Sequence, residues 1–103
     1  MTESEFNELV DAVFQRIEFA IDGGDADIDY DSNGTVLEME FADGSKVIVN
    51  RHVPNREIWL AAKSGGFHYS LQDGTWFSQR DGSELFAKLG DLVQLGTGTR
   101  LDF

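Results

Sequence analysis

The sequence predicts an α+β fold, a two-layer α-β sandwich in which an N-terminal and a C-terminal helix pack on one face of a five- to six-stranded antiparallel sheet. Apolar residues recur every three or four positions near both ends of the chain, which is the period of an amphipathic helix. Between the ends the period falls to two, as in strands, and short turn sequences such as Asn33-Gly34, Asp43-Gly44 and Asp73-Gly74 separate the alternating runs. Such turns join neighbouring antiparallel strands, so the strands are expected to form one sheet. Both amphipathic helices are then expected to pack on one face of that sheet.

The first helix is expected over residues 5–22, where apolar residues follow one helix face. Thr2 precedes a glutamate by three residues, and this spacing predicts a capping box. At about 100° per residue, Asp11, Glu18 and Asp22 fall close together beside the apolar stripe. They form an acidic ridge along the helix. The stripe consists of Phe6, Leu9, Val10, Val13, Phe14, Ile17, Ala20 and Ile21.

A first strand is expected over residues 25–31, after Gly23-Gly24 ends the helix. Aspartates alternate there with Ala26, Ile28 and Tyr30, which places the carboxylates on one face. Because helix and strand are consecutive, we expect their acidic surfaces to be neighbours. The aspartates are Asp25, Asp27, Asp29 and Asp31.

Four or five further strands are expected, over residues 35–41, 46–51, 56–61, 67–71 and 75–78. In the run 56–61, Ile58 and Leu60 alternate with Trp59, so Trp59 stands on the open face if the other two face the helices. An exposed tryptophan is a candidate contact for a protein partner. A second helix is expected after an N-cap at Ser83 and ends near Gly96.

The charge is concentrated at the start of the chain. The 103 residues carry 19 Asp and Glu against 8 Lys and Arg, a formal net charge of −11, and ten of the carboxylates lie in the first 31 residues with Arg16 as the single cation. Clustered like charges destabilise a compact state, so this surface is expected to attract cations or basic partners. Phe19 interrupts the polar side of the same helix as an exposed aromatic.

Composition excludes several classes of function. The sequence has no cysteine, which removes disulfides, thiolate metal sites and thiol nucleophiles. The few cations are scattered, so we expect no nucleic-acid partner. No apolar run approaches the ~20 residues that span a membrane, and the N-terminus is acidic, so we expect no membrane association and a cytoplasmic location. Length and apolar content predict one folded domain.

Weaker patterns have simpler explanations. Residues 29–40 satisfy the spacing of an EF-hand calcium loop, but the strand period that follows excludes the flanking helices that such a loop needs. His52 and His68 lack the spacing of a helical metal site and are more typical of surface or sheet residues. No Ser-His-Asp or Cys-His arrangement and no phosphate-binding glycine loop occurs, so no catalytic site is predicted.

Several segments together resemble the frataxin family, in its bacterial branch, nearly from end to end. The specific match is the stretch from Asn50 to Ala61, Asn-Arg-His-Val-Pro-Asn-Arg-Glu-Ile-Trp-Leu-Ala, followed by Gly-Gly-Phe-His-Tyr at 65–69 and Asp-Gly-Thr-Trp at 73–76. Asp-Ile-Asp at 27–29 and Gly-Ser-Lys-Val-Ile-Val-Asn at 44–50 add to it. The resemblance implies a single domain over residues 1–103.

The resemblance also implies a function. Proteins of this family bind iron weakly through carboxylates of the first helix and first strand, and they act in iron–sulfur cluster assembly with a cysteine desulfurase and a scaffold protein, as iron donor or iron-dependent regulator. Fe²⁺ or Fe³⁺ is then the expected cargo, bound exchangeably, and other divalent cations compete for the hard oxygen ligands. The metal-binding residues implied are Asp11, Glu18, Asp22, Asp25, Asp27 and Asp29, and the partner-binding residues are Glu18, Asp22, Asn50 and Trp59.

Two other functions remain open from the sequence. The first is an acidic interaction module whose ridge binds a basic protein surface, with metal binding incidental. The second is a weak ferroxidase, although no recognisable redox site is encoded. In each case a monomer is expected, and iron-dependent oligomers are possible because bound cations would relieve repulsion between copies.

Overall fold

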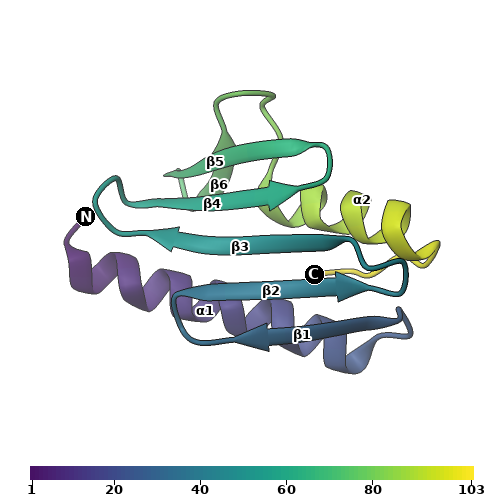
Figure 1. Cartoon of the computed structure of the whole chain (residues 1–103). Helices are drawn as coiled ribbons and strands as arrows, with labels where there is room; N and C mark the ends of the chain where they lie inside the picture. The colour runs from purple at the N-terminus through teal and green to yellow at the C-terminus, as the bar shows by residue number, and fades with distance from the viewer.

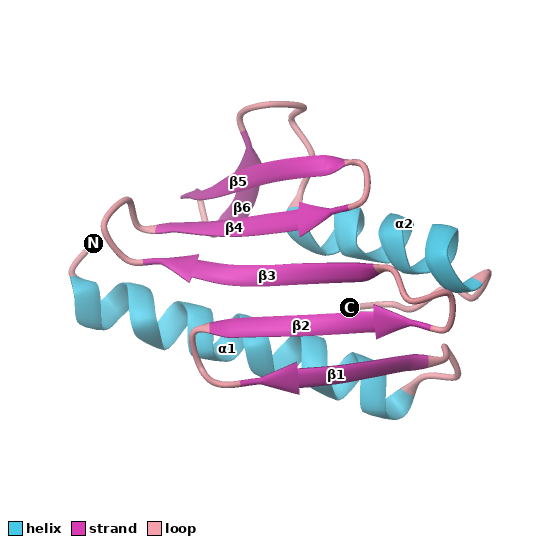
Figure 2. Ribbon diagram, in the orientation of Figure 1, coloured by secondary structure: helices cyan, strands magenta, loops and turns pink.

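The computed structural model describes residues 1–103. Its elements are α1 (Glu3–Gly23), β1 (Ile28–Ser32), β2 (Val36–Phe41), β3 (Lys46–His52), β4 (Glu57–Ala62), β5 (Gly65–Gln72), β6 (Thr75–Ser78) and α2 (Leu85–Thr97). Both helices lie on the same side of one six-stranded sheet (Figures 1 and 2). The predicted two-layer α+β sandwich is therefore confirmed.

The sheet is an antiparallel meander in which spatial order equals sequence order. Its register places Trp59 of β4 between Asn50 of β3 and His68 of β5. At the other side of the sheet, Asp29 of β1 lies opposite Glu40 of β2. Side chains alternate along a strand. The apolar residues next to these five belong to the core or pack against it, and Arg51 bonds to Asn7 of α1, so all five stand on the face that the helices leave open.

The core fills the space between the helices and the sheet. The ring of Phe6 on α1 meets that of Trp76 on β6 edge-on, with centroids 6.2 Å apart and planes at 71°. Leu9 and Ala20 lie at the margins of the predicted helix stripe, since Leu9 is exposed and Ala20 half-buried. The buried apolar residues are Phe6, Val10, Val13, Phe14, Ile17, Ile21, Leu37, Met39, Phe41, Val47, Val49, Ile58, Leu60, Phe67, Tyr69, Trp76, Leu85, Leu89, Val93 and Leu101.

Helix α1 begins with the predicted capping box. The Thr2 hydroxyl accepts from the Glu5 amide at 3.1 Å, and the Glu5 carboxylate accepts from the Thr2 amide at 3.1 Å. These hydrogen bonds lower the pKa of Glu5. Neither helix of the structure is long and apolar enough to cross a membrane.

The first strand is shorter than predicted, because β1 begins at Ile28 and leaves Asp25 and Asp27 in the loop after α1. Ile28 pairs with Phe41, the last residue of β2. Beyond Phe41 the chain turns back, with the Gly44 amide bonded to the Phe41 carbonyl at 2.9 Å. Residues 25–27 therefore have no neighbouring strand to pair with, whatever their alternation.

The predicted N-cap of the second helix was wrong, whereas its predicted end near Gly96 is confirmed to within one residue. The N-cap is Glu84, whose carboxylate accepts from the amides of Phe86 and Ala87 at 2.8 and 3.1 Å. The hydroxyl of Ser83 is instead within 2.9 Å of the Tyr69 hydroxyl and donates to Asp81 at 2.7 Å. At the other end the helix runs to Thr97, and Gly98 closes it in the left-handed conformation that glycine adopts without strain.

Asp81 fixes the loop before α2, and its replacement by asparagine is expected to destabilise the protein at pH 7. The carboxylate accepts from the hydroxyl and amide of Ser83 and lies 3.0 Å from the Lys88 ammonium. The Ser83 hydroxyl first, and then Lys88, hold the pKa of Asp81 well below its ordinary value. A lowered folded-state pKa gives stability that is present above the unfolded pKa, about 4, and is lost as pH falls towards the folded value.

The urea midpoints of wild type, Asp81→Asn and a control, Asp91→Asn, at pH 7, 4 and 2 check this expectation. The wild type should exceed Asp81→Asn at pH 7, and the difference should shrink steadily below about pH 4. Asp91 is an exposed carboxylate on α2, so its variant should stay close to wild type. A difference for Asp81→Asn that is as large at pH 2 as at pH 7 would contradict the assigned cause.

Candidate functional site

Trp59 stands on the open face of the sheet, as predicted, but it does not stand alone. The His52 ring stacks on one face of its indole, with centroids 3.8 Å apart and planes at 8°. The His68 ring stacks on the indole too, at 4.2 Å and 5°. Three parallel rings from β3, β4 and β5 thus form one row, which we call the His–Trp–His stack.

Glu57 fixes the polar edge of this stack. Its Oε1 accepts from the Trp59 indole Nε1–H at 3.0 Å and lies 4.0 Å from Nδ1 of His68. Its Oε2 accepts from the Ser70 hydroxyl at 3.4 Å. The indole therefore has both a hydrogen-bonded edge and covered faces.

The four predicted partner-binding residues fall on two surfaces. Asn50 is the cross-strand neighbour of Trp59 and shares its face. Glu18 and Asp22 lie on α1, which covers the opposite face of the sheet. A partner that contacts both pairs must therefore reach around the β1 side of the molecule, or two partners must share them.

Asp11, at the start of the predicted ridge, is engaged by a cation. The Arg51 guanidinium of β3 donates to its Oδ1 at 2.6 Å and to the side-chain oxygen of Asn7 at 3.1 Å. The Arg51 side chain is only 10% exposed, whereas that of Asp11 is 59% exposed. Part of the negative charge of Asp11 thus serves to neutralise a nearly buried arginine.

Asp22 joins the helix to the first strand. The Tyr30 hydroxyl of β1 lies 2.9 and 3.0 Å from its two carboxylate oxygens and donates to them. This hydrogen bond, with smaller contributions from burial and from the charges of Asp22 and Glu18, raises the pKa of Tyr30. The contact explains why the α1 carboxylates and the β1 carboxylates lie on neighbouring parts of the surface.

Asp29 faces the open side of the sheet rather than the helix. It lines a shallow hollow of about 180 Å³ with Tyr30, Asp31, Glu38 and Glu40. Lys46 binds Glu38 at 2.7 Å, and this bond, followed by the charges of Glu38 and Glu40, raises the pKa of Lys46. The predicted acidic surface therefore continues from α1 around the β1 edge onto the sheet.

These carboxylates form an open surface and not a closed metal cage. No three His, Asp or Glu side chains lie close enough together to hold one metal ion between them. Glu18, Asp22, Asp25, Asp27 and Asp29 also lack any ion pair within the chain. Carboxylate oxygens suit hydrated iron and other hard divalent cations, and so few fixed ligands favour loose, exchangeable binding.

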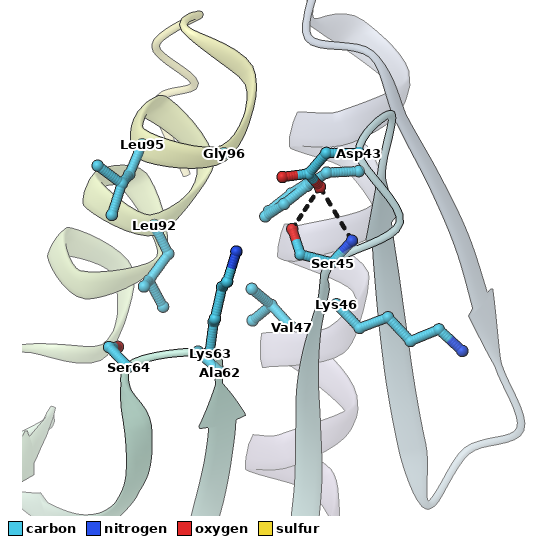
Figure 3. A pocket seen from close by; sticks show the side chains of 11 residues that line it. Asp43, Ser45, Lys46, Val47, Ala62, Lys63, Ser64, Leu92, Leu95 and Gly96 are labelled. Carbon is cyan, nitrogen blue, oxygen red and sulfur yellow. Dashed lines mark hydrogen bonds between the residues drawn. The ribbon is translucent and has the colours of Figure 1, made fainter.

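A cleft of about 300 Å³ opens between α2 and the ends of β2, β3 and β4 (Figure 3). Lys63 points into it, while Lys46 points away to the other face. Asp43 on its rim accepts from the hydroxyl and amide of Ser45 at 2.6 and 2.9 Å, which lowers the Asp43 pKa. None of the predicted site residues lines this cleft.

Sequence reasoning missed the roles of His52, His68 and Glu57. The alternation along each strand does place all three on the open face with Trp59. Their contacts, however, depend on the register of β3, β4 and β5, which is set by the lengths of the turns between them. With the register known, the four residues would have been grouped.

Comparisons with known proteins give a consistent result. Residues 1–99 match the family model described as Frataxin-like domain. The chain is 53% identical over 89 residues to the iron-sulfur cluster assembly protein CyaY of Vibrio cholerae, covering 86% of each chain. It is 46% identical over 103 residues to the protein of the same name from Vibrio campbellii, covering 100% of this chain and 99% of that one.

Solved structures agree with the sequence matches. Frataxin from Psychromonas ingrahamii, of the CyaY protein family, superposes with a TM-score of 0.95 at 37% identity, over 99% of this chain and 97% of that one. Trimeric frataxin from the yeast Saccharomyces cerevisiae, complexed with ferrous iron, superposes with a TM-score of 0.73 at 25% identity, over 96% of this chain and 88% of that one.

Proposed function

Because this chain belongs to the frataxin-like family, we propose that it acts in iron–sulfur cluster assembly as an iron donor or iron-dependent regulator of the cysteine desulfurase and scaffold complex. Residues 1–103 form the single frataxin-like domain that does so. Ferrous or ferric iron is its exchangeable cargo. Asn50 and Trp59 contact a protein partner from the open sheet face.

The observation that carries this proposal is an acidic surface whose carboxylates form no ion pair within the chain. Glu18, Asp22, Asp25, Asp27 and Asp29 extend from the second half of α1 to β1, and no Lys or Arg of the chain neutralises them. Such a surface attracts a cation from solution, and it releases the cation readily because no cage encloses it. Asp11 contributes less, since Arg51 already binds it.

A second function is favoured by the absence of any three-ligand group. The same surface then acts as an acidic interaction module that docks on a basic patch of the desulfurase, and iron binding is incidental. Electrostatic docking of this kind gives fast association that weakens with salt.

Asp22→Asn is expected to weaken Fe²⁺ binding by up to about 30-fold, because a unit charge about 4 Å from a divalent ion contributes about 2 kcal/mol even in water. Asparagine keeps an acceptor for the Tyr30 hydroxyl, so the contact between α1 and β1 survives. Anaerobic Fe²⁺ titration followed by backbone amide signals measures the effect. Asp91→Asn on α2 changes the net charge equally and serves as the matched control.

The outcomes separate the two functions. Line broadening confined to residues 18–29 in wild type, lost in Asp22→Asn and kept in Asp91→Asn, supports the iron-binding role. Equal broadening in all three proteins contradicts it. If iron-free protein binds and regulates the desulfurase as well as the iron-loaded protein does, and Asp22→Lys abolishes that binding, the interaction module is the better description.

A further inference from the structure

We propose that His52 and His68 are positioning residues that hold the Trp59 indole in one orientation, so that its edge is presented ready for a protein partner. The inference rests on the proposed docking role of Trp59. It adds two residues that had no assigned role and a reason for their place beside the indole.

The geometry leaves the indole little freedom. Each of its faces is covered by a parallel imidazole within stacking distance, one from β3 and one from β5. Its Nε1–H is bonded to Glu57 at 3.0 Å. Rotation about either side-chain torsion of Trp59 would separate the stacked rings and break this hydrogen bond, so one rotamer is selected. The part of the ring that stays accessible is an edge.

His52 contacts the indole through ring stacking. Its Nδ1 atom is buried and has no hydrogen-bond partner. Buried polar atoms are normally paired, so the ring occupies this place for its contact with the indole and not for a hydrogen bond at Nδ1. The two imidazoles lie on opposite sides of the indole, and they are therefore separated too widely to share one metal ion.

His68 is the exposed member of the stack, with 56% of its side chain accessible. It borders a hollow of about 240 Å³ that Glu57, Gly66, Gln79 and Arg80 also line. The charged groups that line this hollow are Glu57 from β4 and Arg80 from the loop after β6. A partner that covers the indole edge meets this polar hollow next to it, which suits a polar side chain beside an apolar contact.

Preorganisation predicts a measurable gain in affinity. A tryptophan that is free on a sheet surface loses its rotamer freedom when a partner binds, and this loss weakens binding. A tryptophan held between two stacked rings has lost that freedom before the partner binds. Removing both imidazoles with His52→Ala and His68→Ala together is therefore expected to raise the dissociation constant for the desulfurase–scaffold complex about 2- to 10-fold. Replacing both by phenylalanine keeps two stacking rings and should keep the affinity.

Two readouts test the inference on the full chain. The order parameter of the Trp59 indole Nε1–H, from ¹⁵N relaxation, should fall in the double alanine variant and recover in the double phenylalanine variant, while the urea midpoint reports any general loss of stability. The dissociation constant should change in parallel with the order parameter. An order parameter that is unchanged in the double alanine variant would overturn the proposal that His52 and His68 hold the indole in place.

Trp59→Ala separates the inference from its premise. If this variant loses binding but the double alanine variant binds as wild type, the docking role stands and the positioning role is overturned. If Trp59→Ala itself binds as wild type, the docking role fails and the inference fails with it. Loss of binding in the double alanine variant without rescue by phenylalanine also contradicts positioning by stacking.

Discussion

Replacement of Trp59 by alanine is expected to weaken binding to the desulfurase–scaffold complex by about 30-fold or more. Tryptophans at the centre of an interface commonly contribute at least about 2 kcal/mol by alanine substitution. Trp59 meets the conditions for such a role, because it is a large ring on an open sheet face and its orientation is already fixed by His52, His68 and Glu57.

Ile48→Ala provides the matched control for this experiment. Ile48 is a half-buried apolar residue on the same open face, and its cross-strand neighbour in β4 is Ala61 and not Trp59. Its truncation should change the dissociation constant less than about 3-fold, as is usual for the energetically neutral contacts around a hot spot. Equal effects of Trp59→Ala and Ile48→Ala, measured by calorimetry at fixed salt, would remove Trp59 from the binding site.

Phe6→Ala is expected to lower the free energy of unfolding by about 3–5 kcal/mol, which is the usual cost of removing a buried phenylalanine ring. Phe6 is fully buried on α1 and meets Trp76 edge-on. Domains of this size are stable by only about 5–15 kcal/mol. The substitution therefore removes a large share of the total and should lower the melting temperature by about 12 °C or more.

Phe19→Ala is the control, since the same residue type on the same helix is 82% exposed. Surface truncations away from special contacts change stability by about 0.5 kcal/mol or less, and alanine favours the helix slightly. Urea titration of both variants measures the contrast. A loss for Phe19→Ala as large as that for Phe6→Ala would mean that the outer surface of α1 is covered in solution.

The two-layer architecture was predictable because its signals are local. The helical period of α1, the capping box at Thr2 and the alternation around Ile58 and Leu60 each reflect contacts within one element, and all three are confirmed. The predictions that failed concern positions where contacts with segments distant in the sequence determine the structure. Asp25 and Asp27 alternate like strand residues, yet β2 ends before it can pair with them. Ser83 resembles an N-cap, but Tyr69 and Asp81 engage its hydroxyl.

The candidate site, too, could be predicted from the sequence only in part. Charge density and strand alternation in the sequence placed the carboxylates of α1 and β1 on the surface and Trp59 on the open face. Two contacts could not be predicted from local patterns, because they depend on how the helix layer packs on the sheet. They are the ion pair between Asp11 and Arg51 and the hydrogen bond between Asp22 and Tyr30. The assignment of these carboxylates to iron stays a prediction until the titration is made.

The sheet order has a further consequence at β1, which pairs with β2 alone and so leaves one row of backbone N–H and C=O groups free at the border of the sheet. A strand from another molecule can add to such a border, and proteins commonly prevent this with charged side chains. Asp29 and Asp31 stand on this strand, and two copies approaching border to border would bring like charges together. Asp29, which is proposed to bind iron, and Asp31 therefore also oppose edge-to-edge aggregation, and this protection weakens when cations neutralise them.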